Sequence, residues 1–534
     1  MQKSFFALIL LLAAAMQTKA QSSFDWQVSI TPLSIPNMPA LQSFAKAQHN
    51  GKWLLIGGRK DGLHARQPFS AFPALQNNAT VYVVDPVSAQ VWSAPLSGLP
   101  TGITEQLQST NMNFYQDHDT LYIIGGYAFS ATANDHITFD KLSSIDIPGL
   151  MNAVQTNAPV ASFFKQISDT LFANTGGQLG KIGNEFVLVG GQRFDGRYNP
   201  MNNPTYTQTY HTRITRFRIN NSGNQLSISN VQTVYDAVHL RRRDYNLLPQ
   251  VFPDGSEGYT ISAGVFQANA DLPFLYPVDI TATGYIPRTG FNQYLSHYHS
   301  ARACLWDSTA NRMHNLFFGG MSQYFMQNGV LTQDVNVPFV KTISRMSRMA
   351  DSTLQEVQLN TDMPALLGAG AEFFLASGVP HNEHEVIKLH SVSGDTVLIG
   401  YIAGGLLSPS ANPFAGNQSN TTSANATVYK VQLIRNHNVP GQVVESRNPF
   451  RFTLYPNPAN REVRLRFSLN NATTIRYMLT ALDGRMLAEG DLYGAHSGDN
   501  DIALPLPDAA RGQVRLTLVS EGIYFHTETF YVQH

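Results

Sequence analysis

The stretch Lys52-Trp-Leu-Leu-Ile-Gly-Gly58 is an apolar run that ends in two glycines, and it decides the fold. A run without polar alternation predicts a strand that is buried on both faces. Glycines at its end permit a sharp exit and a close approach of neighbouring backbone. The pattern recurs at Leu121–Gly126, Phe186–Gly191, Leu316–Gly320 and Tyr401–Gly405, with a degenerate copy at Tyr259–Gly264. Six spaced copies indicate a repeat architecture.

The residues around the first copy predict three further strands. Asn50-Gly51 is a two-residue hairpin signal and joins the copy to a strand over Ser43–Gln48. Thr80–Asp85, followed by a proline, and the run that begins at Gln90 predict two strands after it. Each unit therefore holds about four antiparallel strands, which is the composition of a propeller blade.

The double glycine, the later Tyr82, the Asp85-Pro86 turn and Trp92 resemble the kelch repeat, in the order that family shows. The resemblance implies an all-β fold, a six-bladed kelch-like β-propeller over residues 21–438. Most units lack the later tryptophan and all run longer than the usual kelch period of about 50 residues. The alternative is another all-β fold with chance Gly-Gly pairs.

The N-terminal segment at about 24–34 reads as the last strand of a blade with nothing before it. The sixth unit lacks a strand, because it offers only three of the four strands of a blade, at 369–376, 397–405 and 427–434. We therefore expect the N-terminal strand to complete blade 6 and close the ring. The alternative is an ordinary N-terminal tail.

Composition and the N-terminus point to an exported protein. Residues 1–20 combine Lys3, an apolar run over Phe5–Ala15 and a small-residue cleavage pattern at Thr18–Ala20, which predicts a signal peptide. No later segment predicts a membrane span. The net charge of −1 gives no argument for nucleic acid or an anionic membrane as partner. The single cysteine, Cys304, excludes an intrachain disulfide. We expect a monomer.

A linker at 439–449 precedes a change of pattern to short alternating strands at 463–467, 475–479, 501–504, 514–519 and 524–532. These predict a small Ig-like β-sandwich over residues 450–534. Its opening Phe452-Thr-Leu-Tyr-Pro-Asn-Pro-Ala459 and its Leu482-Asp-Gly-Arg485 resemble the C-terminal sorting domain of the type IX secretion system of Bacteroidetes. Gly512-Gln-Val514 and the terminal His534 depart from that family's pattern.

The sorting-domain resemblance implies a route and a partner. The chain would cross the periplasm, engage the type IX machinery, and then be secreted or attached to the outer-membrane surface. Whether the sorting domain is cleaved or anchors the protein stays open.

The segments that follow the glycine pairs predict a binding face. In a propeller they emerge on one side, and here they are long: Arg59–Ala79, Tyr127–Asp140, Gln192–His211, Met321–Phe339 and Leu406–Ala426. Loops beyond about 12–15 residues are usually functional or disordered. Their aromatic, asparagine and glutamine residues can stack on and hydrogen-bond a polar ligand, so we expect a glycan or a protein. The alternative is that these loops are solvent-exposed and bind no ligand, because asparagine, glycine and proline are common loop formers.

Candidate contacts come from positions that face the ligand in kelch binders, just after a glycine pair or just before an inner strand. The resemblance places Arg59, Tyr127, Arg193, Arg243 and His299 there. We assign no catalytic residue, no metal ligand and no cofactor.

The competing hypothesis is a sugar-acting enzyme, because kelch propellers include a galactose-oxidizing copper radical enzyme and a sialic acid mutarotase. The oxidase needs a cysteine linked to a tyrosine, and Cys304 is the only cysteine available; it sits in an expected inner strand, where a buried inert thiol is common. His297 and His299 alternate and can share a metal if they lie on one strand. His381 and His384 lie three apart, but Pro380 argues against the helix of zinc proteases. A third possibility is an adhesive surface protein without a small ligand.

Overall fold

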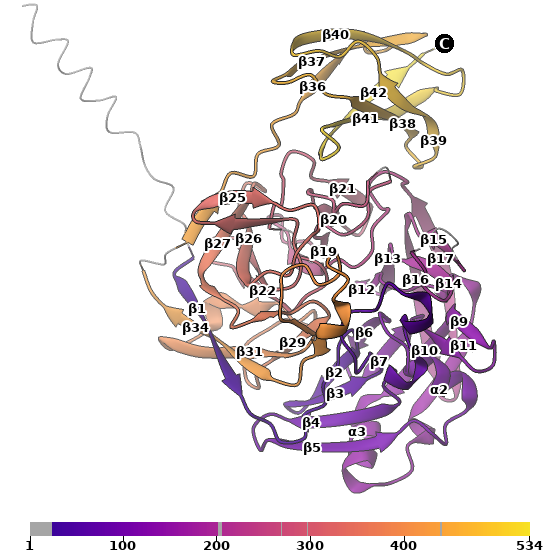
Figure 1. The fold of residues 1–534 in the computed structure, drawn as a ribbon, viewed down its shortest axis with the longest axis vertical. Coiled ribbons are helices and arrows are strands. Elements are labelled where there is room, and N and C mark those ends of the chain that lie inside the picture. Colours follow the sequence, from indigo (N-terminus) through magenta and orange to yellow (C-terminus); the bar gives the residue numbers. More distant parts are fainter. Residues whose placement is uncertain (1–23, 201–204, 269, 296, 438–440, 534) are drawn as a thin grey trace, which may run out of the picture.

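The computed structural model describes residues 24–200, 205–268, 270–295, 297–437 and 441–533. The predicted signal peptide at 1–20 lies outside the described residues. The chain forms an all-β, six-bladed kelch-like propeller followed by a small β-sandwich, as Figure 1 shows.

Blades 1 to 3 are four-stranded antiparallel sheets. In order from the innermost strand outward they are β2 (Ala45–His49), β3 (Lys52–Ile56), β4 (Thr80–Asp85) and β5 (Gln90–Pro95); β6 (Asn113–Asp117), β7 (Thr120–Ile124), β10 (Lys141–Asp146) and β11 (Phe164–Ser168); and β12 (Gln178–Ile182), β13 (Glu185–Val189), β16 (Arg213–Ser222) and β17 (Gln225–Tyr235).

Blades 4 to 6 repeat this order. They are β18 (Leu247–Val251), β19 (Glu257–Ile261), β20 (Val278–Ile280) and β21 (Tyr285–Pro287); β22 (Arg302–Asp307), β23 (Arg312–Phe318), β26 (Thr342–Arg348) and β27 (Leu354–Asp362); and β29 (Ala371–Leu375), β31 (Thr396–Gly404), β34 (Val428–Arg435) and β1 (Trp26–Leu33).

The glycine pairs join each blade to the next. The second glycine donates its backbone N–H to a carbonyl oxygen of the following blade, from Gly58 to Ser109 at 2.8 Å and from Gly126 to Asn174 at 2.9 Å. Gly191, Gly320 and Gly405 do the same. The first glycine has positive φ and is closely packed; a Cβ on Gly125 would lie 1.8 Å from the carbonyl oxygen of Asn174. The motif is therefore the joint between blades.

The N-terminal strand closes the ring. β1 pairs antiparallel with β34 along its whole length, from Trp26 opposite Arg435 to Leu33 opposite Val428. Phe24, Trp26 and Val28 are buried in the core that blade 6 shares with blades 1 and 5. The first and last parts of the propeller therefore lie in one sheet.

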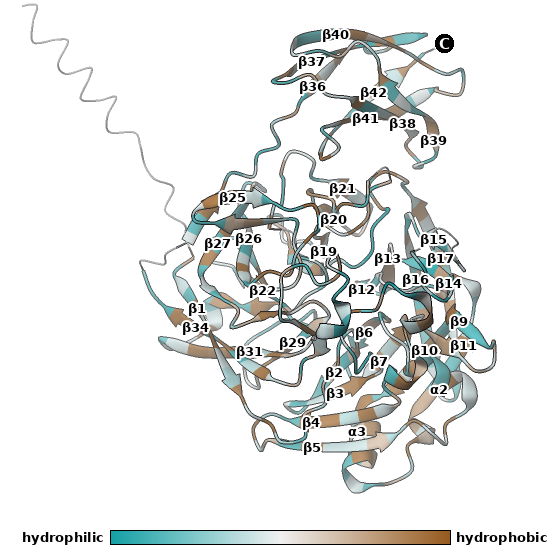
Figure 2. Ribbon diagram, in the orientation of Figure 1, coloured by the Kyte–Doolittle hydropathy of each residue, from teal (hydrophilic) through white to brown (hydrophobic). Residues whose placement is uncertain are grey.

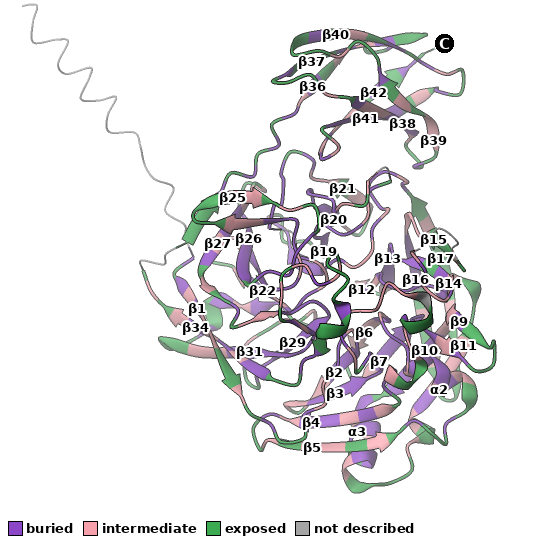
Figure 3. Cartoon of the chain, in the orientation of Figure 1, coloured by how far each residue is buried: buried purple, intermediate pink, exposed green. Residues whose placement is uncertain are grey.

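Burial follows the blade order. The second strand of most blades is buried along nearly its whole length, as in β3 and β23, whereas the outer strands β5 and β17 are largely exposed, a contrast that Figure 3 shows in purple and green. Two helices, α2 (Thr101–Leu107) and α3 (Ile147–Thr156), lie on the outside, and α3 packs its apolar face beside β4, visible in brown in Figure 2. Among the described residues, none of the helices has the length and apolarity needed to span a bilayer.

The sandwich has two sheets. One contains β36 (Phe452–Tyr455), β37 (Glu462–Leu469) and β40 (Gly498–Pro505), and the other β39 (Met486–Leu492), β38 (Ile475–Ala481), β41 (Gly512–Ser520) and β42 (Tyr524–Val532). The second sheet packs on blade 4, where Met478, Val519 and Phe525 join the cluster of Phe274 and Tyr276. Figure 1 shows the sandwich next to β20 and β21.

Within the segment expected to be a linker at 439–449, described residues add a strand to the propeller. Its residues Gly441–Val444 form β35, which pairs antiparallel with β27 at the edge of blade 5. Asn448 is buried and donates from Nδ2 to the carbonyl oxygens of Thr289, at 2.8 Å, and Phe525, at 2.6 Å. An outer strand offers unpaired backbone groups, and the departing chain satisfies them.

Candidate ligand-binding cavity

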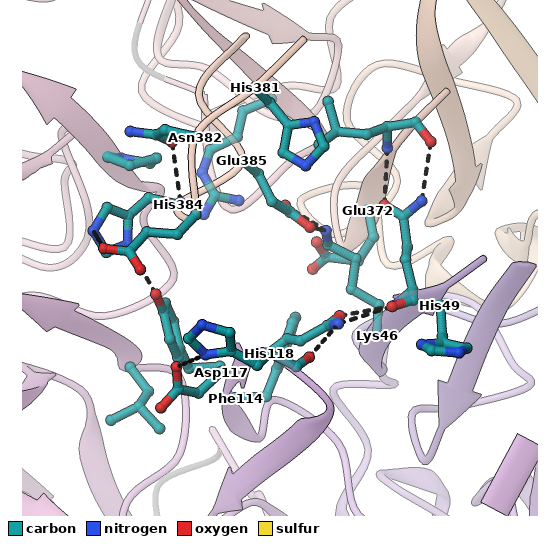
Figure 4. Close-up of a pocket in the computed structure, with 18 of the residues that line it drawn as sticks. Lys46, His49, Phe114, Asp117, His118, Glu372, His381, Asn382, His384 and Glu385 are labelled. Carbon is teal, nitrogen blue, oxygen red and sulfur yellow. Dashed lines mark hydrogen bonds and ion pairs between the residues drawn. The ribbon is translucent and has the colours of Figure 1, made fainter. Parts of the chain in front are cut away.

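The inner strands of the six blades surround a channel with two different ends. At one end lie the glycine pairs and their long loops. At the other lie the hairpins that join each inner strand to its neighbour, such as Asn50-Gly51 and His118-Asp119. A cavity of about 430 Å³ occupies the hairpin end. Figure 4 shows side chains from several blades around it.

Two glutamines of the cavity wall have structural roles. The amide of Gln116 in blade 2 forms two 2.8 Å hydrogen bonds with the backbone N–H and carbonyl of Gln48 in blade 1. The amide of Gln48 does the same for Leu375 in blade 6, at 3.0 and 2.9 Å. These side chains take the place of backbone pairing between neighbouring inner strands, so they fix the wall.

Two contacts between an acidic and a basic side chain border the cavity. Lys46 Nζ is 2.8 Å from Glu385 Oε2, and His299 Nε2 is 3.0 Å from Glu372 Oε1. Burial favours the neutral form of Glu372, but the hydrogen bond from His299 and the charge of Lys46 outweigh it, so the pKa of Glu372 is lowered. The wall thus presents an ionised carboxylate beside a cation.

A segment between β29 and β31 crosses the mouth of the cavity. This crossing segment, residues 376–388, contacts three other blades through its side chains: Glu385 pairs with Lys46 of blade 1, His384 Nδ1 lies 2.8 Å from the hydroxyl of Tyr115 in blade 2, and Asn382 donates to Glu257 of blade 4 at 3.1 Å. Its last residues form β30 (Ile387–Lys388), which runs parallel to β22 in blade 5. The cavity is therefore partly covered.

The long loops at the glycine end pack on one another. His64 from the loop of blade 1 has its ring centroid 4.6 Å from Tyr198 of blade 3 and 5.3 Å from Phe414 of blade 6, and the indigo and orange loops meet over the ring in Figure 1. Burial lowers the pKa of His64 to about 4. Under these loops, the channel contains a void of only about 10 Å³ beside Asp244 and His299.

Two of the candidate contacts converge under these loops. Arg59 is buried, binds Asp61 and Asn77, and lies with its guanidinium 5.2 Å from the ring centroid of Phe72. Tyr127 is also buried, packs edge-on against the same Phe72 ring and donates from its hydroxyl to the carbonyl of Gly196 at 2.8 Å. Both residues fasten the loops to the blades.

The other three candidates lie apart. Arg193 is half-exposed and pairs with Asp195 at 2.5 Å. Arg243 pairs with Asp244 and lies over the ring of Phe266. His299 faces the channel and Glu372. The structure thus brings Arg59 and Tyr127 together and leaves Arg193, Arg243 and His299 in separate settings; their role in binding stays a prediction.

The histidines and the cysteine considered for metal chemistry do not meet. His297 is buried and lies between the Gly319 carbonyl and the Ser344 hydroxyl, and burial lowers its pKa to about 4. His381 Nδ1 lies 2.7 Å from the carbonyl oxygen of Val379, so the ring contacts its own segment. Burial raises the pKa of Cys304 to about 12 in an apolar cluster whose described members include no tyrosine. These surroundings do not fit a cysteine–tyrosine copper site.

Sequence reasoning missed most of the cavity residues. His49, Asp117, His118 and Glu383 sit in hairpins and in the crossing segment, and nothing in their spacing connects them. One signal was available: Asn50-Gly51 and the similar turns mark the end of each inner strand, and these turns must share one rim of the ring.

No family model matches the chain, and no curated protein matches it. Solved structures are similar to it, and they include the following two. A fungal alcohol oxidase of the AA5 family, in complex with copper, is 11% identical, with 95% of this chain and 99% of that chain covered and a TM-score of 0.35. YjhT is 10% identical, with 77% and 99% covered and a TM-score of 0.41. The assignment of the blades rests on the strand pairings described above.

Proposed function

We propose that this propeller binds a polar ligand of monosaccharide size, the sugar unit of a glycan, in the cavity at its hairpin end. The observation that carries the proposal is a 430 Å³ cavity with converging charged and aromatic groups. That volume lies within the range of about 300–1,000 Å³ typical of small-molecule sites. This location differs from the long-loop face that the sequence suggested.

The chemistry of the lining supports a polyhydroxylated ligand. Lys46, Glu385 and Glu372 offer charged donors and acceptors side by side, as vicinal hydroxyls require. Phe114 and Tyr115 offer ring surface for the apolar face of a sugar. The rim histidines His49 and His118 are accessible to a longer glycan chain.

Glycan-array and titration experiments on residues 21–534 test the location. His49→Ala with His118→Ala should weaken binding at least tenfold, whereas Arg193→Ala, on the loop face, should leave it unchanged. Binding that survives the histidine pair and is lost in Arg193→Ala would return the site to the long loops. No binding to any glycan would favour a protein ligand or an adhesive role.

A second candidate is a sugar-acting enzyme of the mutarotase type, favoured by the 2.8 Å contact between Lys46 and Glu385. Mutarotation needs a base to take the proton of the anomeric hydroxyl and an acid to protonate the ring oxygen as its bond to the anomeric carbon breaks; reclosure reverses both transfers. Glu385 and Lys46 would supply these groups without a cofactor. Exchange NMR of galactose and N-acetylneuraminic acid anomers tests it, with Glu385→Gln expected to abolish any acceleration. We propose no step through copper, because Cys304 lacks the surroundings for it.

We also propose export through the type IX system, on the support of the signal-peptide pattern at 1–20 and the motif at 452–459. The motif begins in β36, where Phe452 is buried in the core of the sandwich. Deletion of 450–534 in a Bacteroidetes host should retain the protein in the periplasm. Normal surface display or secretion of the truncated chain would contradict this role.

A further inference from the structure

We propose a divalent metal site at the mouth of the cavity, formed by Glu257, Glu383 and His384. One carboxylate oxygen of each glutamate and a ring nitrogen of the histidine lie within 4.8 Å of one another. His384 Nε2 is 3.4 Å from Glu257 Oε2 and 3.6 Å from Glu383 Oε1. One imidazole and two carboxylates are a donor set that suits zinc and manganese.

The position of His384 is the second observation. Its side chain is only 7% exposed, yet Nε2 points at two carboxylates whose side chains are 42% and 63% exposed. A single N–H can donate to one of them with good geometry, and at 3.4 and 3.6 Å it does so to neither. A divalent cation between the three groups would serve both carboxylates at once.

The other ring nitrogen is already held as metal-binding histidines require. Nδ1 lies 2.8 Å from the hydroxyl of Tyr115, and with a metal on Nε2 the imidazole keeps its proton on Nδ1 and donates it to that oxygen. Asn382 orders the backbone, since its Oδ1 accepts from the N–H groups of His384 and Val386, both at 3.0 Å.

The three donors come from two parts of the ring. Glu257 is the first residue of β19 in blade 4, whereas Glu383 and His384 belong to the crossing segment of blade 6. Asn382 already bridges the two through its contact with Glu257. A metal here would clamp the crossing segment to blade 4 and leave its remaining coordination positions for water or a ligand oxygen.

The test measures metal alone, so its outcome is separate from that of glycan binding. Metal-free protein, residues 21–534, is titrated with zinc and with manganese by calorimetry, and unfolding is followed with and without each ion. We expect one equivalent of at least one of the two ions to bind with a dissociation constant below about 10 μM and to raise the melting temperature, as preferential binding to the folded state requires.

Variants locate the ion. Glu257→Gln with Glu383→Gln, both at exposed positions, should weaken binding at least a hundredfold, and His384→Gln should do the same. Two matched changes should leave it unaltered: Asp254→Asn on the hairpin that leads to β19, and His381→Ala in the crossing segment. Absence of stoichiometric binding, or binding that survives the glutamate pair, would overturn the site.

Discussion

The backbone N–H of Gly405, in the last blade, donates a 2.8 Å hydrogen bond to the carbonyl oxygen of Leu41, just before the first. The contact repeats the one that joins Gly58 to Ser109 and Gly126 to Asn174. The contact between blades 6 and 1 is thus the same as the contacts between blades that follow one another in the sequence. The motif that recurs in the sequence is therefore a ring-forming element.

We predict that replacing a glycine of this joint by alanine costs much more stability than the same change at a glycine of positive φ outside it. A Cβ at Gly183 would meet nothing within 4 Å, so Gly183→Ala should cost about 1 kcal/mol from its left-handed backbone alone. At Gly125 the Cβ would overlap the carbonyl of Asn174, so Gly125→Ala should cost about 2–3 kcal/mol more. Chemical denaturation measures both. Equal costs would mean that the blades do not rely on this close approach.

Ring closure by β1 makes Trp26 part of the core. Its side chain is buried, and the guanidinium of Arg435 lies 4.4 Å from its ring centroid. Trp26→Ala should lower the free energy of unfolding by about 3–5 kcal/mol, because it leaves a cavity. Ser29→Ala, on the same strand, should change it by less than about 0.5 kcal/mol. Similar small effects from both would indicate a loosely attached N-terminal segment.

We predict that the buried carboxyl group of Glu356 makes the folded protein less stable as the pH rises. It is buried where β27 meets the end of β35, and it accepts from the N–H groups of Tyr294 and Leu295. Burial, the largest influence, raises its pKa to about 8 from 4.5. Between those values the folded state holds a proton that the unfolded state has released, so stability falls as the pH rises from about 4.5 to 8.

Glu356→Gln isolates this contribution. The variant loses some stability at every pH, because the two backbone N–H groups bond different carboxyl oxygens and the amide nitrogen that replaces one of them cannot accept. Its unfolding free energy should nevertheless show a smaller decline across that pH range than the unmodified chain. Melting curves at several pH values measure the difference, and an unchanged slope would place the titration elsewhere.

The sandwich is held to blade 4 by a buried polar contact. Arg515 Nη1 lies 3.4 Å from Asp236 Oδ2 and donates to the hydroxyl of Tyr285 at 2.6 Å, while Asp236 is 1% exposed. Arg515→Ala would leave a buried carboxylate without its cation, at a cost of about 2 kcal/mol. The exposed Arg511→Ala should cost little. Limited proteolysis should cut the chain between the two domains faster in Arg515→Ala only; equal rates would show that the contact does not hold the domains together.

Much of the fold could be predicted because the signals are local. Gly-Gly after an apolar run marks every blade except the fourth, where Ala263 replaces the first glycine, and Trp26 marks the closing strand. In the sandwich, buried and more exposed positions alternate along β37 as expected, whereas β39 was not predicted because Glu489 and Asp491 make it polar.

The site could not be predicted in the same way. Lys46, Tyr115, Glu257 and His384 belong to four different blades, and only the closed ring brings them to one rim. Contacts among the long loops could not be predicted for a related reason. Aromatic residues such as Phe72 and Tyr198 suit ligand stacking, but here they pack against His64 of the loops themselves.

Hydrogen–deuterium exchange with and without a bound sugar tests the central claim most directly. Galactose, glucose and N-acetylneuraminic acid at tens of millimolar are the probes, with titration first selecting one that binds. We expect protection at residues 48–51, 115–118 and 376–388, which line the cavity at the hairpin end, and no change at 59–79, 192–211 and 406–426. Protection confined to those long loops, with the hairpins and the crossing segment unaffected, would contradict the account.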